Sequence, residues 1–270
     1  MHKLSLAVGF FLCVFSLGCG GGGGSNGSSS NGGSSQFTPA NIQGQYEAVA
    51  SSTAAPGSVA LIESNFTQTG TNVFASKQNV VLIIGTQSSG TITLTSLGGA
   101  CDNGASGNDS LQATFTSATN LSFTLTEAGS LGTGTTTGTV TFSPDGSQIT
   151  SGTYTTPAAC GFQGDSGTII GTKIQPFAGA YAGYLSNGVG TDAVIVTVSQ
   201  SSLNLNVSGT DNGAAFTLTG SVTGATFDVS GTISGQAVQY VGIFDHVNNA
   251  FLVYNTSLTY LGKLHTGSTP

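Results

Sequence analysis

The sequence predicts an all-β protein in which antiparallel strands follow one another as a meander and close into one or two small barrels. From Phe37 onward, short apolar and Thr- or Val-rich runs alternate with clusters of Gly, Asn, Asp and Ser. Between Leu203 and Ser208 apolar and polar residues alternate strictly, which is the pattern of a half-buried strand. No helix-period stretch exceeds about two turns, and the 42 glycines disfavour helices. We expect about eighteen strands, with a β-sandwich as the alternative architecture.

The N-terminus has the composition of a secretory signal peptide. Lys3 gives a basic start, and a mostly apolar run follows from Leu4 to Leu17. This run is shorter than the about 18 residues that a membrane-spanning helix needs. Its length fits the apolar core of a cleaved export signal.

The run ends in Ser16-Leu17-Gly18-Cys19, which resembles the lipobox of bacterial lipoproteins. In that family the Cys thiol is diacylated, the leader is cut before it, and the new amine is acylated. The resemblance implies a signal peptide at 1–18, cleavage after Gly18 and a lipid on Cys19. Because Gly20 rather than Asp follows the Cys, the family's sorting rule implies the outer membrane, with the periplasmic or surface face left open. The resemblance covers about the first 24 residues.

Residues 19–36 form the predicted tether between the lipid and the body of the protein. Five glycines at 20–24 are followed by Ser, Asn and Gly as far as Gln36. Such a segment has almost no side chains to bury, so it cannot offset the entropy of becoming ordered.

The body is expected to contain two β-domains, at 37–175 and 176–270. Ile42-Gln43-Gly44-Gln45-Tyr46 is similar to Phe177-Ala178-Gly179-Ala180-Tyr181, and Ser122-Phe123-Thr124-Leu125-Thr126 is similar to Ala215-Phe216-Thr217-Leu218-Thr219. These similarities suggest an internal repeat, with Pro176 at the boundary. The second domain would hold about eight consecutive strands, enough for a small barrel.

Composition excludes several function classes. The chain has no Arg and four Lys in all, and its formal net charge is -7. Four scattered Lys cannot neutralise a phosphate backbone, so nucleic acid is excluded as a partner. No phosphate-binding loop with a terminal Lys-Ser/Thr is present, and no Cys-x-x-Cys or His pair suggests zinc, so we expect no cofactor and no metal.

Two cysteines remain after processing of the leader and lipidation of Cys19. Cys101 and Cys160 both lie in segments that are predicted to be loops at strand ends. Because an exported domain with two cysteines usually pairs them, we predict a disulfide between them.

Two short motifs suggest catalysis, but each has a simpler explanation. Gly164-Asp165-Ser166-Gly167 resembles the segment around the nucleophile of trypsin-like proteases, in which a His base and an Asp precede the Ser. Here the only preceding His is His2, in the leader, so we interpret the motif as a turn. Asp245-His246 is the only acid–His neighbour pair and is expected at a hairpin tip, since Asn248 and Asn249 follow.

Acidic and aromatic residues supply the remaining candidates. Asp102 and Asp109 bound a polar loop that could offer oxygen ligands to Ca²⁺, although a solvated loop is the expected structure. Five carboxylates in or beside strands are expected to face solvent rather than to form a glycosidase pair: Glu47, Glu63, Glu127, Asp192 and Asp228. Six tyrosines are expected in the core or in cross-strand pairs, with a ligand site as the alternative: Tyr46, Tyr181, Tyr184, Tyr240, Tyr254 and Tyr260.

The expected function is that of a lipid-anchored envelope protein without catalysis, which presents its Ser-, Thr- and Asn-rich surface to polysaccharide or protein for a structural, adhesive or recognition purpose. The alternative is a barrel that binds a small apolar or amphipathic molecule, as lipocalins do. A hydrolase is the third hypothesis. An open apolar interior would favour the carrier, and an interior filled by side chains would favour the structural role.

Overall fold

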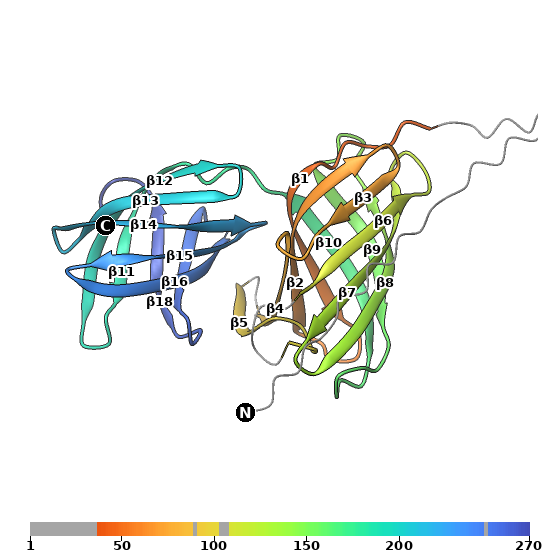
Figure 1. Ribbon diagram of the computed structural model, residues 1–270, viewed down its shortest axis with the longest axis horizontal. Coiled ribbons are helices and arrows are strands. Elements are labelled where there is room, and N and C mark those ends of the chain that lie inside the picture. The colour runs from red at the N-terminus through yellow and green to blue at the C-terminus, as the bar shows by residue number, and fades with distance from the viewer. Residues whose placement is uncertain (1–36, 89–90, 103–107, 246–247) are drawn as a thin grey trace, which may run out of the picture. The chain divides into compact units, whose positions relative to one another are not determined.

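The computed structural model describes residues 37–88, 91–102, 108–245 and 248–270. Within these residues the chain forms eighteen β-strands and no helix, and sixteen of the strands make two closed antiparallel barrels of eight strands each (Figure 1). We call them the first and the second barrel in chain order. The predicted fold class is confirmed, and the sandwich alternative is excluded.

The first barrel is a meander with one inserted hairpin. Its ring closes because β1 pairs with both β2 and β10. In ring order its strands are β1 (Gly44–Ser52), β2 (Ser58–Thr69), β3 (Asn72–Ala75), β6 (Ser110–Phe115), β7 (Asn120–Gly129), β8 (Gly132–Phe142), β9 (Gln148–Thr156) and β10 (Asp165–Lys173). The inserted hairpin consists of β4 (Val80–Ser88) and β5 (Thr91–Leu97), and β4 pairs with β2 outside the ring.

The second barrel is an uninterrupted meander. Each strand pairs with the next, and β18 returns to pair with β11, so no strand edge is left open. Its strands are β11 (Gly179–Ser186), β12 (Thr191–Ser201), β13 (Asn204–Asp211), β14 (Ala214–Thr223), β15 (Thr226–Ile233), β16 (Gln236–Asp245), β17 (Ala250–Asn255) and β18 (Tyr260–Thr266). Asn212-Gly213 and Ser234-Gly235 connect their strands with two residues of positive φ, as tight hairpins require.

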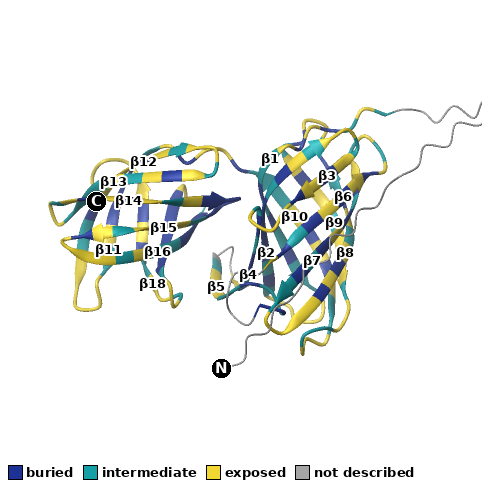
Figure 2. Ribbon diagram, in the orientation of Figure 1, coloured by how far each residue is buried: buried dark blue, intermediate teal, exposed yellow. Residues whose placement is uncertain are grey.

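The strands alternate in burial, and this alternation places the core inside each ring. In β12, Val194, Val196 and Val198 are buried while Ile195 between them is 36% exposed. Figure 2 shows the same alternation as bands of buried and exposed residues along the strands of both barrels. Leu203, which we expected in a strand, lies in the turn before β13. The inward positions of the strands therefore determine what each barrel contains.

The lipobox residues Gly18 and Cys19 lie outside the described residues. In the part of the chain that the structure describes, no helix is long and apolar enough to cross a membrane.

Candidate ligand-binding site

The interior of the second barrel contains a cavity of about 310 Å³. The interior of the first barrel holds only about 30 Å³ of free space. The walls of the larger cavity are mainly Val, Leu, Ile and Phe side chains, and all eight strands contribute to them. Both rings have eight strands, so the number of strands does not explain why the free volumes of the two interiors differ. We attribute the difference to the side chains.

Two inward-facing positions of the second barrel are glycines, which carry no side chain. Cross-strand partners in an antiparallel sheet point to the same face. Gly220 is the partner of Val229, and Gly231 is the partner of Leu218; both partners line the cavity. These glycines therefore also face inward, where they contribute no side chain.

Aromatic rings cover two inward glycines of the first barrel. A Cβ added to Gly138 would lie 2.7 Å from ring carbons of Phe123, and one added to Gly167 would lie 2.8 Å from a ring carbon of Tyr154. In the second barrel a ring covers Gly242, where the corresponding distance to Phe227 is 2.4 Å, but no ring atom is among the nearest neighbours of Gly220 or Gly231. The first barrel is therefore filled where the second is hollow.

The aromatic residues of the second barrel gather at one end of the ring. The rings of Phe177, Tyr181, Phe244 and Phe251 lie with centroids 4.6–6.4 Å apart. The Tyr181 hydroxyl donates a 3.1 Å hydrogen bond to the carbonyl oxygen of Phe177. The Phe177 N–H donates to Oε1 of Gln200 at 2.8 Å. Of these four residues Phe251 lines the cavity, and the other three rings pack around it.

Polar groups line the opposite end. Asp192 lies two residues before Val194, and Asp211 is the cross-strand partner of Val194, so both carboxylates share the inner face. Asp192 accepts hydrogen bonds from the side-chain amides of Asn187, at 2.9 and 3.0 Å, and of Asn212, at 2.5 Å. Oδ1 of Asp211 is buried and has no hydrogen-bond partner.

The electrostatics of this end follow from the two carboxylates. Burial, and then the neighbouring Asp192, raise the pKa of Asp211 above its ordinary value. Burial raises the pKa of Tyr240, and the charges of Asp211 and Asp192 raise it further. Among the described residues that line the cavity there is no Lys or His, and the chain has no Arg. The polar end is therefore rich in acceptors and negatively charged.

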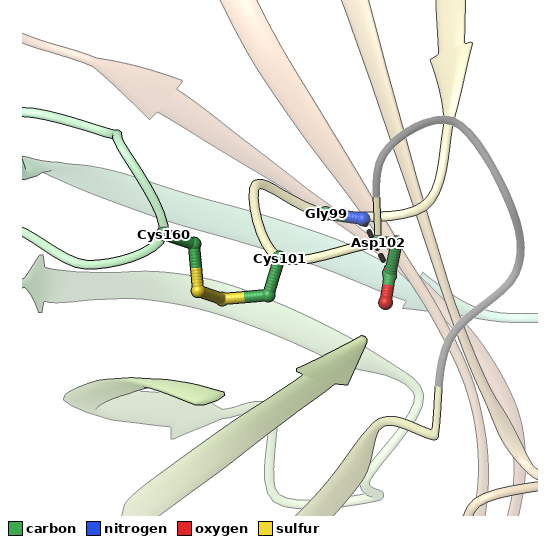
Figure 3. The surroundings of a disulfide bond; sticks show 4 residues. All are labelled: Gly99, Cys101, Asp102 and Cys160. Atoms are coloured by element: carbon green, nitrogen blue, oxygen red, sulfur yellow. Dashed lines mark hydrogen bonds between the residues drawn. A yellow bond between two sulfur atoms is a disulfide. The ribbon is translucent and has the colours of Figure 1, made fainter. Parts of the chain in front are cut away.

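The predicted disulfide is confirmed. Cys101 and Cys160 are joined by an S–S bond of 2.06 Å, with Cα atoms 5.1 Å apart (Figure 3). Cys101 follows β5 in a turn, and Cys160 lies in the connection between β9 and β10, so both are loop residues as expected.

The prediction of a solvated loop is wrong at its two ends. Asp102 is 3% exposed and Asp109 is 1% exposed, and both lie near the buried Glu127. Oδ2 of Asp102 accepts the N–H of Gly99 at 2.8 Å (Figure 3), whereas each of the three carboxyls keeps one buried oxygen without a partner. Burial, and then the charges of Asp102 and Glu127, raise the pKa of Asp109 to about 7.

This acidic cluster does not form a metal site in the structure. Among the described residues, no group of three or more His, Cys, Asp or Glu side chains is arranged to hold a metal ion. The loop itself, 103–107, lies outside those residues.

The prediction that the strand carboxylates face solvent holds for one residue and fails for three. Asp228 is exposed and accepts from the side-chain amide of Gln239 at 3.0 and 3.1 Å. Glu127 is 8% exposed, and Glu63 is completely buried. Glu47 is half-buried beside Glu63, its cross-strand partner.

Burial is the main influence on the Glu47–Glu63 pair. It raises the pKa of Glu47 to about 7 and, together with the charge of Glu47, holds the pKa of Glu63 well above its usual range. Oε2 of Glu63 accepts the N–H of Ala225 at 2.6 Å. The fifth residue, Asp192, lines the cavity end described above.

The prediction of a turn at the protease-like motif is wrong for most of it. Gly164 has a positive φ, but Asp165, Ser166 and Gly167 are the first residues of β10. The carboxylate of Asp165 accepts the hydroxyls of Tyr154 at 2.6 Å and of Ser52 at 2.8 Å. Ser166 is exposed, and its hydroxyl oxygen lies 3.3 Å from that of Thr53. These contacts bring no acidic or basic side chain to the Ser166 hydroxyl.

Asp245 lies where a hairpin tip was predicted. It ends β16, and its carboxylate accepts the backbone N–H of Asn248 at 3.1 Å and the side-chain amide of the same residue at 2.6 Å. His246 lies outside the described residues.

The tyrosines divide between the two expected roles. Tyr46, Tyr181 and Tyr254 are buried, and Tyr254 forms a cross-strand pair with Tyr260 at a centroid distance of 5.4 Å. Tyr184 is 56% exposed, contrary to the expectation. Tyr240 lines the cavity, which was the alternative role.

Sequence reasoning missed Asp211 and the cavity itself. A signal was present: glycines recur every eleven residues at Gly209, Gly220, Gly231 and Gly242. Each falls on an inward position of a successive strand from β13 to β16. A glycine that recurs with the strand repeat indicates a regular, curved ring in which neighbouring backbones approach closely.

Comparisons with known proteins add no relative to these observations. No protein-family description matches the chain, and neither a curated protein nor a solved structure is significantly similar to it.

Proposed function

We propose that the second barrel binds a small, mostly apolar molecule inside its ring, and that the protein acts as a carrier or receptor for that molecule in the bacterial envelope. The observation that carries this proposal is the apolar cavity of about 310 Å³, against about 30 Å³ in the first barrel. Sites for small ligands are typically concave and mostly apolar, with volumes of about 300–1,000 Å³.

The energetic argument favours an occupied cavity. If a space of about 310 Å³ stayed empty, it would cost about 7 kcal/mol relative to a filled interior, at about 24 cal/mol per Å³. Net stabilities of domains are about 5–15 kcal/mol, so such a cost is a large fraction of the total. A bound molecule offsets it by restoring van der Waals contacts with the wall.

Binding rather than catalysis agrees best with the groups at the polar end. Asp192 is engaged by two amides, which reduces its freedom to act as a base or nucleophile. The described lining residues include no His, Cys or Lys. The first barrel, whose interior is filled, would serve as a structural support in this proposal.

The envelope location rests on the lipobox resemblance at Cys19 and stays part of the proposal. A lipid on Cys19 and a tether at 19–36 would hold the barrel near a membrane, where small apolar molecules partition. Stable anchoring by several acyl chains follows from about 0.8 kcal/mol for each buried methylene.

Native mass spectrometry tests the proposal. Residues 37–270 form one compact unit that contains every described strand and the disulfide. The chain from Gly20 onward, exported to a bacterial periplasm and purified without detergent, should carry an additional mass that is lost on gentle activation. Val229→Phe, which places a ring in the cavity, should lose that mass, whereas Val140→Phe in the filled barrel should keep it.

A bare mass that stays bare after incubation with apolar probes would contradict the proposal. Binding of whole cells or polysaccharide without an internal ligand would then favour the structural or adhesive role.

A further inference from the structure

We propose that the molecule bound in the second barrel is an amphiphile with a primary amine head, which lies between Asp211 and Asp192 while its apolar body occupies the cavity. This inference rests on the proposed function and adds to it the chemical class of the ligand. Three observations carry it: the charge of the polar end, one unpartnered acceptor, and the volume of the cavity.

The charge at the polar end favours a cation. Asp192 and Asp211 line the cavity, and the described lining residues include no Lys or His that would neutralise them. Lys263, on β18 of the same barrel, is exposed and does not line the cavity. A fatty acid or other anionic head would meet two carboxylates at close range, whereas an ammonium group would be attracted by both.

The unpartnered oxygen of Asp211 favours a head with hydrogen atoms to donate. Its Oδ1 is buried and accepts no hydrogen bond, which is costly unless another group supplies a donor. The oxygens of Asp192 already accept the amides of Asn187 and Asn212. Asp192 therefore contributes its charge, and Asp211 contributes the free acceptor. A primary ammonium has three N–H donors, so it can bond Asp211 and still reach a second acceptor such as the hydroxyl of Tyr240.

The closed end of the cavity fits an apolar body. The ring cluster of Phe177, Tyr181, Phe244 and Phe251 lies at the end opposite the two carboxylates, and the wall between them is apolar. A cavity of about 150 Å³ holds a benzene molecule, so a cavity of about 310 Å³ has room for about twelve heavy atoms. An alkylamine of about ten carbons has this size and this distribution of polarity.

Binding of three matched probes to the chain from Gly20 onward tests the inference. Decylamine, decanol and decanoate have nearly the same size and differ in the head group alone. Titration calorimetry at neutral pH and low salt should give the tightest dissociation constant for decylamine. Hydrogen bonds to charged groups correspond to about tenfold to hundredfold in affinity, so decylamine should bind at least about tenfold more tightly than decanol. Decanoate should bind most weakly.

Two variants identify the residue responsible. Asp211→Asn keeps the shape of the side chain and removes its charge, and it should lower the ratio of decylamine to decanol affinity about tenfold or more. Asp228→Asn removes a carboxylate of the same barrel that is exposed and bonded to Gln239, and it should leave the ratio unchanged. Circular dichroism and the intact disulfide mass show that each variant is folded.

The outcomes separate this inference from the proposed function. Equal affinity for decylamine and decanol, tightest binding of decanoate, or an unchanged ratio in Asp211→Asn would overturn the amine head and leave the carrier function standing. If none of the three probes binds the folded wild-type chain, the carrier function fails and the inference fails with it.

Discussion

Placing the same larger side chain in the two barrels should give opposite effects on stability. Val229 on β15 and Val140 on β8 are each 4% exposed, face the interior of their barrels, and have an inward glycine as a cross-strand partner: Gly220 for Val229 and Gly152 for Val140. They differ in the free volume of the barrel interior that each side chain faces, which is about 310 Å³ for Val229 and about 30 Å³ for Val140. Val229→Phe should stabilise the protein slightly, and Val140→Phe should destabilise it.

The expected magnitude follows from the carbon atoms added. Phe in place of Val buries about four further carbons, which gain about 3 kcal/mol at about 0.8 kcal/mol each. Ordering of the ring and small shifts of its neighbours reduce that gain by about 1–2 kcal/mol, so Val229→Phe should raise the free energy of unfolding by about 1 kcal/mol. In the filled barrel the ring has no such space, and overpacking should lower the free energy of unfolding by about 1–3 kcal/mol.

Urea unfolding of both variants, followed by far-ultraviolet circular dichroism, measures this difference. Thermal midpoints should move in the same directions, by about 2–4 °C per kcal/mol for a chain of this size. The ligand-free protein must be used, because a bound molecule would itself stabilise the wild type. If Val229→Phe destabilises the protein as much as Val140→Phe, the second barrel is not hollow, and the reasoning from its cavity is refuted.

Three further predictions concern the rest of the structure. Because the folded state holds a proton on Asp109 up to about pH 7, whereas the unfolded chain releases it near its ordinary pKa, stability should fall as pH rises through this interval. Asp109→Asn should therefore raise the free energy of unfolding by about 1–3 kcal/mol at pH 8 and change it little at pH 4; an equal effect at both pH values in urea titrations would contradict this. Reduction of Cys101–Cys160, whose sequence separation is 59, should lower stability by about 4 kcal/mol, measured by unfolding with and without reductant; an unchanged midpoint would argue against the pairing. Gly242→Ala would place a Cβ 2.2 Å from a backbone oxygen and should cost at least about 2 kcal/mol, whereas Gly190→Ala, with nothing within 4 Å, should be neutral; similar calorimetric midpoints would show that the strand tolerates the contact.

Local sequence pattern was sufficient to predict the fold class and the disulfide. Strand alternation and hairpin residues act over two to ten positions, so the order of polar and apolar residues reveals them. Val194, Val196 and Val198 were identified as strand residues in this way, and all three are buried. The pairing of Cys101 with Cys160 could be predicted because only these two cysteines are expected to remain after processing of the leader and lipidation of Cys19.

The proposed internal repeat shows the limit of short similarities. Gly44 and Gly179 begin the first strand of their barrels, and the following Tyr46 and Tyr181 are both buried, so the first pair of motifs occupies equivalent positions. The second pair does not: its motifs lie in β7, fifth in the ring of the first barrel, and in β14, fourth in the ring of the second. Similarity in a composition rich in Thr and Gly thus arises without structural equivalence.

The glycine repeat alone does not predict the cavity, because the free space also depends on residues that meet only when the ring closes. Which atoms cover an inward glycine depends on the neighbouring strand: a ring of Phe123 lies over Gly138 in the first barrel, whereas no ring lies over Gly220 or Gly231 in the second. Phe177 and Phe251, which are distant in sequence, form one cluster at the barrel end. The alternation of apolar and polar residues within a single strand reveals neither of these arrangements.

The scarcity of cations links the buried carboxylates to the proposed ligand. A chain with no Arg cannot neutralise its buried acids by ion pairs with guanidinium groups, so it must bond them to neutral donors or keep them protonated. Asp165 accepts two hydroxyls, and Asp192 accepts the amides of two asparagines. Glu63 and Asp109 lie among other carboxyl groups. Their raised pKa values favour the protonated, uncharged form.

Asp211 differs from these acids because its unpartnered oxygen adjoins a cavity large enough for a molecule. Its neighbour Asp192 already accepts hydrogen bonds from the side-chain amides of Asn187 and Asn212, so the free acceptor is on Asp211. A protonated Asp211 would need an acceptor for its own hydrogen, whereas an ammonium head would satisfy the oxygen and the charge together. Other buried acids also keep an unpartnered oxygen, but Asp211 lines the cavity, so a ligand can supply its missing donor.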